Sequence, residues 1–143
     1  MSPETLFSIC GTAVLPGWLL LVFAPRWKLT KLLINSCLLP LLLAFVYLFL
    51  IVTHFGQTEG GFGSLADVSK LFQNPHALLA GWIHYLAFDL FVGGWEVRDA
   101  GRHGITHLLV VPCLILTFLL GPIGLLLYFI LRWALRRKFL IEE

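Results

Sequence analysis

The chain has 143 residues, of which 59% are hydrophobic and 13% charged, and its formal net charge is +2. The apolar fraction exceeds the roughly 45–50% of soluble domains, and a chain this short has too much surface to hide it from water. Composition therefore excludes an ordinary soluble domain and predicts an all-α integral membrane bundle, a single domain over residues 1–143 with the lipid bilayer as solvent. The weak net charge argues against nucleic acid as a partner.

Four transmembrane helices are expected, because about 20 apolar residues are needed to cross the hydrocarbon core. They cover about residues 5–24, 31–53, 75–98 and 105–133. A short amphipathic helix over residues 64–72, between the second and third spans, is predicted to lie along the membrane surface. Pro16-Gly17 predicts a kink in the first span. At about 1.5 Å per residue the fourth span is too long for one upright crossing, so Gly121-Pro122 predicts a kink there or a break into two shorter helices.

The basic residues leave the orientation of such a bundle open. With four spans, one side would hold Arg26, Lys28, Lys31, Arg98 and Arg102, and the other Lys70, Arg132, Arg136, Arg137 and Lys138. This five-to-five tie gives the positive-inside rule no preference. The N-terminus shows neither the basic region of a signal peptide nor an Arg- and Ser-rich transit segment. We therefore expect a bacterial inner membrane or a cyanobacterial thylakoid membrane.

The third span differs from the others because it carries ionisable side chains. His84, Asp89 and Glu96 lie within it, and Asp99 lies near its end. A charged group at the bilayer centre costs roughly 2.5–3.5 kcal/mol on insertion scales, so these side chains are expected to face the bundle interior or a wet cavity. At 100° per residue, one stripe contains Tyr85, Phe88, Asp89, Val92 and Glu96. His84 lies about 140° from Asp89, at the opposite edge of that stripe.

A simpler interpretation is that these groups only fix the packing of helices. Asp89 and His84 would then be satisfied by polar side chains of other helices. Glu96 and Asp99, being closer to the interface, would be solvated or paired with Arg98 or Arg102.

A metal site is a weaker alternative at the end of the third span. Asp99, His103 and His107 are spaced i, i+4, i+8, and the two histidines have a spacing that suits two imidazoles on one metal ion. Gly101 and Gly104 argue against a continuous helix through this segment, and interfacial histidines are the commoner case. No cofactor is predicted.

The segment from Gly81 to Trp95, GWIHYLAFDLFVGGW, followed by Asp99, resembles the signature of the abscisic-acid-deficient-four-like family. Pro16-Gly17-Trp18, Pro25-Arg26-Trp27 and Asn74-Pro75 are similar to that family as well. Its members are four-span membrane proteins of plant plastids, cyanobacteria and other bacteria. Plant members are needed to make neoxanthin from violaxanthin, an isomerisation that opens an epoxide into an allene. The resemblance thus implies a protein of carotenoid or isoprenoid metabolism with a xanthophyll-like substrate. Because bacteria do not generally make neoxanthin, a bacterial member can keep the scaffold and act on a different substrate.

Related chemistry would need an acid at the epoxide oxygen and a base at the neighbouring carbon. Desolvation favours the protonated form of a carboxyl group, so within the resembling motif we expect Asp89 to be the acid and His84 the base. The side chains expected to bind the substrate are Trp82, Tyr85, Phe88, Glu96 and Asp99.

Two other functions stay open. One is a non-catalytic carotenoid- or lipid-binding protein that assists a partner enzyme, which is favoured over hydrolysis because no nucleophile with an adjacent base is evident. The other is a small transporter or channel subunit, which is disfavoured because few intramembrane charges lie on different helices and no inverted repeat is visible. Neither the oligomeric state nor catalysis itself follows from the sequence.

Overall fold

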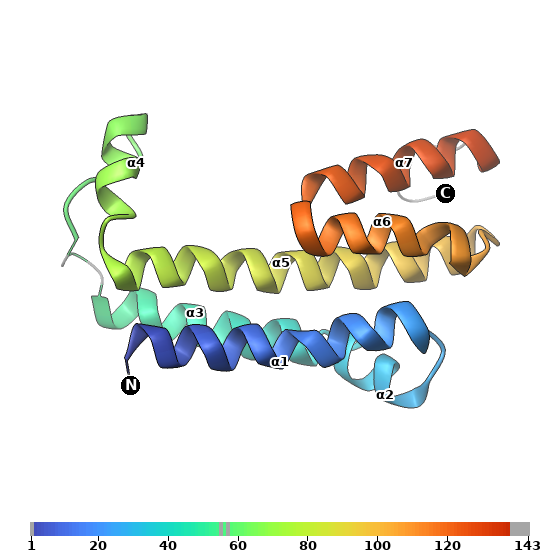
Figure 1. The fold of residues 1–143 in the computed structure, drawn as a ribbon, viewed down its shortest axis with the longest axis horizontal. Coiled ribbons are helices and arrows are strands. Elements are labelled where there is room, and N and C mark those ends of the chain that lie inside the picture. The colour runs from blue at the N-terminus through green and yellow to red at the C-terminus, as the bar shows by residue number, and fades with distance from the viewer. Residues whose placement is uncertain (1, 55, 57, 138–143) are drawn as a thin grey trace.

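The computed structural model describes residues 2–54, 56 and 58–137, and every regular element in these ranges is a helix. In chain order the elements are α1 (Pro3–Phe23), α2 (Lys28–Thr30), the π-helical turn η1 (Lys31–Asn35), α3 (Leu38–His54), α4 (Leu65–Leu71), α5 (Pro75–Arg102), α6 (His107–Leu120) and α7 (Pro122–Arg136). Figure 1 shows their arrangement. The all-α prediction is confirmed.

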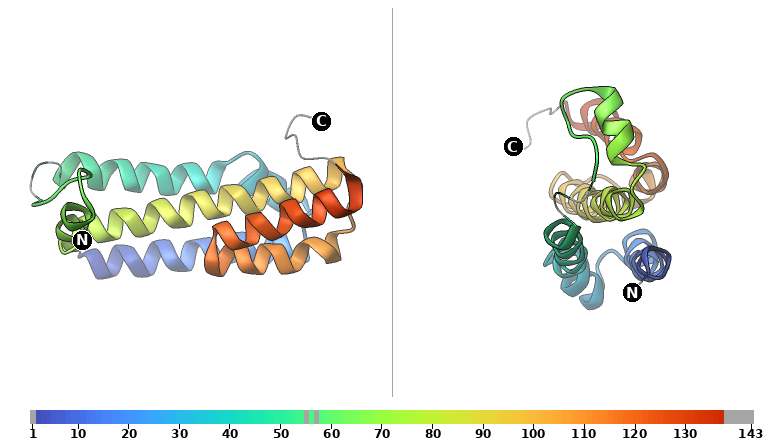
Figure 2. Two further views of the ribbon diagram at one scale, coloured as in Figure 1. Left: turned by 90° about the horizontal axis from the view of Figure 1, so that it is seen from above. Right: turned by 90° about the vertical axis from the view of Figure 1, so that its left-hand side faces the viewer.

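Helix α5 is the axis of the molecule, because both halves of the chain pack against it. Helices α1 and α3 run along one side of it for most of its length, and α6 and α7 lie on the other side along its second half (Figures 1 and 2). The buried side of α5 toward α1 and α3 is apolar, with Ile83 and Leu90 fully buried. The stacked rings of His54 and His76, with centroids 3.8 Å apart, join the end of α3 to the start of α5.

Three helical segments are long and apolar enough to cross a membrane, and they coincide with the first three predicted spans. They are Pro3–Phe23, Lys28–His54 and Pro75–Arg102. Helix α1 continues through Pro16 and Gly17 without a break. Helix α5 begins at Pro75 because Asn74 caps it, its side chain accepting hydrogen bonds from the backbone N–H groups of His76 and Ala77.

The predicted fourth span is two helices, so the four-span arrangement is not confirmed. The chain reverses at Gly121, whose φ of +50° and ψ of −98° suit a residue without a Cβ, and Pro122 then starts α7 in a new direction. With 14 and 15 residues, α6 and α7 are about 21 and 22 Å long, short of the roughly 30 Å hydrocarbon core. They form an antiparallel hairpin on α5 (Figure 2), which we call the α6–α7 hairpin.

The second span is interrupted near one end. After α2, the turn η1 replaces the regular helix, and Cys37 then adopts a left-handed conformation with φ of +61° before α3 begins. Pro40 contributes to this break, because a proline lacks the N–H that would continue the hydrogen-bond ladder.

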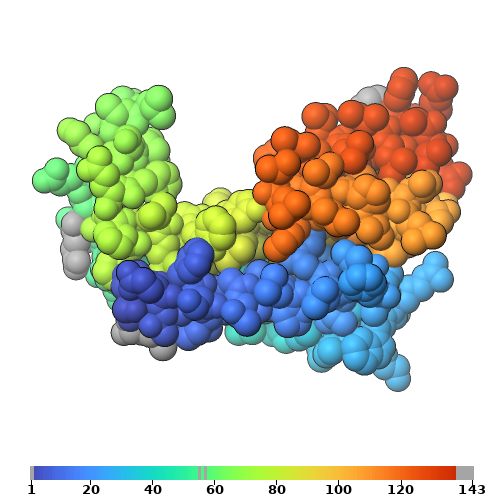
Figure 3. Space-filling model, viewed as in Figure 1, coloured from blue at the N-terminus to red at the C-terminus, as the bar shows by residue number. Residues whose placement is uncertain are grey.

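The amphipathic helix between the second and third spans forms as α4, residues Leu65–Leu71. Ser64 caps it by accepting from the N–H of Asp67 at 3.1 Å and by donating to its carboxylate at 2.7 Å. Phe72 then lies against α5, where a Cβ at Gly81 would be 2.8 Å from its ring. A hollow remains above the first half of α5, between α4 and the α6–α7 hairpin (Figure 3).

Candidate functional site

A polar face of α5 points at the α6–α7 hairpin. Along it lie Tyr85, Asp89, Glu96, Asp99 and His103, at intervals of four, seven, three and four residues that keep them on one side of the helix. Tyr85, Asp89 and Glu96 of the predicted stripe therefore face protein, as expected for ionisable groups within a span, whereas Phe88 of the same stripe is exposed.

Asp89 lies under the tip of the hairpin, near the middle of α5. A Cβ placed on Gly121 would be 3.1 and 3.3 Å from its two carboxyl oxygens, so the carboxyl group touches the reversal of the chain. Its Oδ2 atom is buried and has no hydrogen-bond partner within residues 2–54, 56 and 58–137. One turn earlier, Tyr85 donates a hydrogen bond to the carbonyl oxygen of Phe118 at 2.8 Å and ties the end of α6 to α5.

Glu96 and Thr117 form the next contact along this face. The Thr117 hydroxyl lies 3.0 and 3.2 Å from the two carboxyl oxygens of Glu96, and both side chains are fully buried. A Cβ on Gly124 of α7 would overlap the backbone nitrogen of Thr117. The absence of a side chain at Gly124 thus lets α6 and α7 approach closely enough to enclose the Glu96–Thr117 pair.

The third contact is a buried ion pair with two further polar partners. Asp99 Oδ2 lies 3.3 Å from Arg132 Nε and accepts a hydrogen bond from the Tyr128 hydroxyl at 2.5 Å. His103 lies beside them, with Nδ1 3.5 Å from Asp99 Oδ1 and Nε2 3.2 Å from an Arg132 guanidinium nitrogen. This cluster joins α5 to α7, and Arg136 extends the junction by donating to the Gly104 carbonyl oxygen.

The predicted acid and base have different neighbours. The His84 ring is exposed and stacks on Phe88, with centroids 4.6 Å apart, and it lies 5.7 Å from the ring of Tyr47 on α3. Asp89 instead faces the tip of the hairpin. No contact within the described part of the chain joins these two side chains. Phe88 stacks on the ring of His84 instead of lying beside Asp89.

Other predicted binding residues form an aromatic row that leads toward Asp89. The ring of Trp82 lies 5.3 Å from that of Tyr85 and 5.4 Å from that of Phe7 on α1. The row starts at a pocket of about 360 Å³ between the first turns of α1 and α5. The residues that line this pocket are Pro3, Glu4, Phe7, Ser8, Pro75, Leu78, Leu79 and Trp82.

The two weaker metal candidates point to different partners. His107 Nε2 bonds to the carbonyl oxygen of Val22 on α1 at 2.9 Å, whereas His103 belongs to the cluster around Asp99. The residues that the structure describes contain no group of three or more His, Cys, Asp or Glu side chains arranged to hold a metal ion.

Three residues of this site were not anticipated from the sequence: Thr117, Tyr128 and Arg132. The sequence places Arg132 among the basic residues expected at the end of the last span, but its side chain is fully buried. A signal was present, because Tyr128 and Arg132 are four residues apart and share a helical face within an otherwise apolar segment. Thr117 gave none, since a single hydroxyl in a span is common.

The chain is similar in sequence to one described family and to a plant protein. The model of the family described as ABA DEFICIENT 4-like matches residues 5–128. The Protein ABA DEFICIENT 4, chloroplastic, of Arabidopsis thaliana is 24% identical over 150 residues, which cover 95% of this chain and 64% of that protein. The chain therefore spans somewhat less than two thirds of the length of this relative. No solved structure matches the present chain significantly.

The matched region contains the residues of the contacts described above except Arg132 and Arg136, and it leaves out Pro3 and Glu4 of the pocket. It also includes the segment Gly81–Trp95, which carries the resemblance to this family, so that expectation is confirmed. Because the family model covers most of its residues, the chain belongs to the ABA DEFICIENT 4-like family.

Proposed function

We propose that this chain acts on a xanthophyll-like isoprenoid within the membrane as an isomerase-type protein, with Asp89 as its acid. The observation that carries the proposal is the buried Oδ2 of Asp89, which has no hydrogen-bond partner in the described ranges. A carboxyl oxygen buried near the middle of a span without a hydrogen bond is costly, and such groups persist mainly where they have a function. The family membership supports carotenoid chemistry as that function.

The pocket and the aromatic row supply a route for a long apolar substrate. Trp82 and Asp89 are seven residues apart on α5, which is about 10 Å along the helix axis. A polyene lying on the rings of Phe7, Trp82 and Tyr85 would run from the pocket at the start of α5 toward Asp89. The polar oxygens of Glu4 and Ser8 at the pocket would face a hydroxylated end group.

The proposed reaction is an epoxide opening that keeps all atoms of the substrate. Asp89 gives its proton to the epoxide oxygen as one carbon–oxygen bond breaks, which leaves a hydroxyl group. A base removes a proton from the neighbouring carbon, and the electron pair of that C–H bond becomes the new double bond of the allene. The base in this proposal is His84. Because its ring lies against Phe88 and Tyr47, the reacting end group would lie across the α5 surface to reach both residues.

Substitution of Asp89 or His84 tests this proposal in cells that make the epoxide carotenoid. We expect Asp89→Asn and His84→Ala each to lower product formation by at least about 100-fold, the lower range of general acid–base contributions. Pigments are extracted and separated by chromatography, and the amount of protein in the membrane fraction is measured beside them. Glu59→Gln removes an exposed loop carboxylate and serves as the control, with near wild-type yield expected. Wild-type yield from both Asp89→Asn and His84→Ala would rule out the assignment.

A second function, carotenoid binding without catalysis, is favoured by one observation. The Tyr85 hydroxyl already donates to the Phe118 carbonyl, and His84 has different neighbours from Asp89, so the acid stands without an adjacent base. In that case Asp89 would orient a ligand hydroxyl for a partner enzyme. The visible spectrum and extracted pigment of the purified protein distinguish the two functions. A bound polyene that stays unchanged on incubation supports binding, and an altered pigment supports catalysis.

A further inference from the structure

Arg98 is a half-buried arginine of α5 whose charge is not compensated by any other described residue. No hydrogen bond or ion pair joins its guanidinium group to another residue in the ranges that the structure describes. The other arginine that α5 faces from within the protein, Arg132, is paired with Asp99. Arg98 therefore lacks an anionic partner of the kind that Arg132, the buried cation at the same end of the molecule, has in Asp99.

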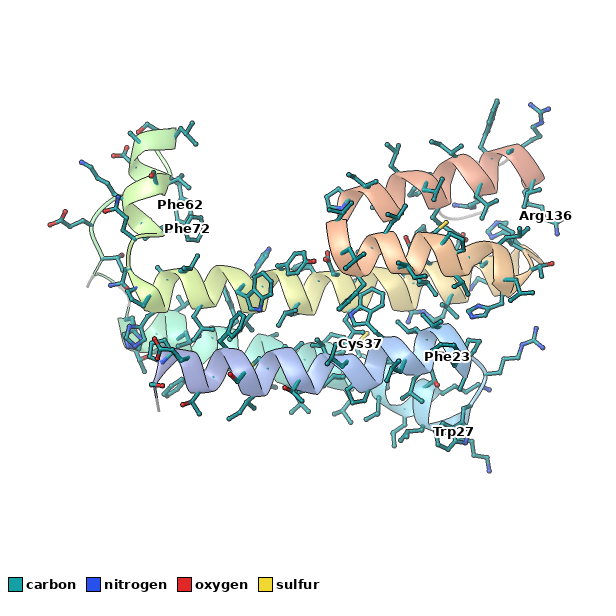
Figure 4. The ribbon with its side chains drawn as sticks, viewed as in Figure 1. Phe23, Trp27, Cys37, Phe62, Phe72 and Arg136 are labelled. Carbon is teal, nitrogen blue, oxygen red and sulfur yellow. The ribbon has the colours of Figure 1, made fainter. Side chains whose placement is uncertain are left out.

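The surroundings of Arg98 are formed by the interrupted second span. Gly94 lies one turn before it, where a Cβ would be 3.4 Å from Arg98 Nη1 and 2.8 Å from Ile34 of η1, so the glycine leaves room for the guanidinium beside that turn. Cys37, with its left-handed backbone, comes just after this turn (Figure 4 labels it). This segment also contains Asn35, whose Oδ1 is buried without a hydrogen-bond partner among the described residues.

A guanidinium group beside such a bend matches the oxygen atoms of a phosphate. Arginine presents a planar fork of N–H donors that fits phosphate in a bidentate manner. A phosphate group here would provide the anion that Arg98 lacks.

The depth of Arg98 indicates where that phosphate comes from. Helix α5 has 28 residues, and Arg98 lies about 14 Å from its midpoint along the axis. The hydrocarbon core extends about 15 Å on either side of the bilayer centre, so Arg98 reaches the layer of lipid headgroups if α5 is centred. Arg102, which is exposed, lies one turn farther out.

We propose that Arg98 and the bend of the second span form a binding site for a phosphate group, presented by an anionic phospholipid. The acyl chains of that lipid would extend from the bend along the apolar outer surface of α3, where Leu41, Leu42 and Phe45 are exposed. This site is on a different side of α5 from Asp89 and does not depend on the function proposed above.

The purified full-length chain in a mild nonionic detergent provides the test. Dioleoylphosphatidylglycerol is titrated, and native mass spectrometry measures the fraction of protein that carries one lipid. We expect Arg98→Gln to weaken this binding at least about tenfold, as for loss of a charge-assisted bidentate contact. Arg98→Lys keeps the charge without the fork and should fall between the two. Arg102→Gln removes an exposed charge of the same helix end and should change binding less than about twofold.

Two further probes separate the possible sources of affinity. Dioleoylglycerol has the same acyl chains without phosphate, and inorganic phosphate has no acyl chains. The proposal expects weak binding of both and no effect of Arg98→Gln on the diacylglycerol. It is overturned if Arg98→Gln binds phosphatidylglycerol like the wild type, if Arg102→Gln loses as much binding, or if diacylglycerol binds equally well. Displacement of the lipid by equimolar inorganic phosphate would also overturn it, because the source would then be free phosphate. Circular dichroism confirms that each variant keeps its helices.

Discussion

Individual ionisable residues of α5 have partners that come from distant parts of the chain. The sequence predicts that Asp89, Glu96 and Asp99 face inward, because charged groups in a span avoid lipid. It also suggests Arg98 or Arg102 as partners for Asp99, since both are close in sequence. In the structure the partner is Arg132, 33 positions later, together with Tyr128. The inward direction follows from local chemistry, whereas the partner depends on how the last segment folds back.

The buried pair Asp99–Arg132 gives a prediction at the level of single residues. Arg132→Met removes the cation and leaves the Asp99 carboxylate buried without it, so we expect the free energy of unfolding to fall by about 3–5 kcal/mol. The double variant Asp99→Asn, Arg132→Met removes both charges and should recover a large part of that loss. Denaturant titration of the detergent-solubilised protein, followed by circular dichroism, measures both.

Lys70→Met is the control for this experiment, because Lys70 is exposed on α4 and its loss should change the unfolding free energy by less than about 0.5 kcal/mol. A double variant as unstable as Arg132→Met alone would contradict a role for the charge pair.

Among the elements, the hairpin is the part of the fold that the sequence leaves undecided. Gly121-Pro122 marks the right position, but both a kinked span and a broken one satisfy its composition. The decision depends on tertiary contacts: Tyr85 bonds the end of α6, and Gly124 allows α7 to pack directly on Thr117. The first three spans and the start of α5 were predictable, because each depends on a local apolar run, a cap or a proline.

The close approach at Gly124 gives a prediction at the level of the hairpin. In Gly124→Ala the new methyl group overlaps the backbone of Thr117, so α7 must move away from α6, and overpacking of this kind costs roughly 1–3 kcal/mol or more. We expect a lower midpoint of thermal unfolding and loss of the Glu96–Thr117 contact. Gly11→Ala is the matched control, because a Cβ at Gly11 in α1 meets nothing within 4 Å. That variant should gain about 0.5–1 kcal/mol from reduced chain entropy. Equal stability of the two variants would contradict the close packing.

At the scale of the whole molecule, the hairpin changes how charge is distributed across the membrane. Because α7 returns to the end where α6 began, its basic residues lie at the same end of the molecule as the loop after α1 and the end of α5 (Figure 1). Of the basic residues that the structure describes, all except Lys70 are then at this end. They are Arg26, Lys28, Lys31, Arg98, Arg102, Arg132, Arg136 and Arg137. The tie expected for four spans disappears, and the positive-inside rule assigns this end to the cytoplasmic side.

Labelling of single cysteines checks this orientation. In a variant whose three native cysteines are replaced, we expect Ser69→Cys on α4 to react with a membrane-impermeant maleimide in intact cells. Arg136→Cys at the end of α7 should react only after the cells are permeabilised. A four-span bundle would place both positions on the same side, so equal labelling of the two would contradict the hairpin. Labelling in the reverse order would contradict the orientation.

The hairpin also makes the cross-section of the molecule larger at its basic end than at its other end. Near the basic end α6 and α7 pack beside α5 and α6 also contacts α1, whereas near the other end α5 is flanked by the hollow beside α4 (Figure 3). Such a wedge occupies more area in one leaflet than in the other, and lipids in the narrower leaflet fill the difference. A membrane that bends with its basic-side leaflet on the convex face accommodates this shape with the least distortion of its lipids.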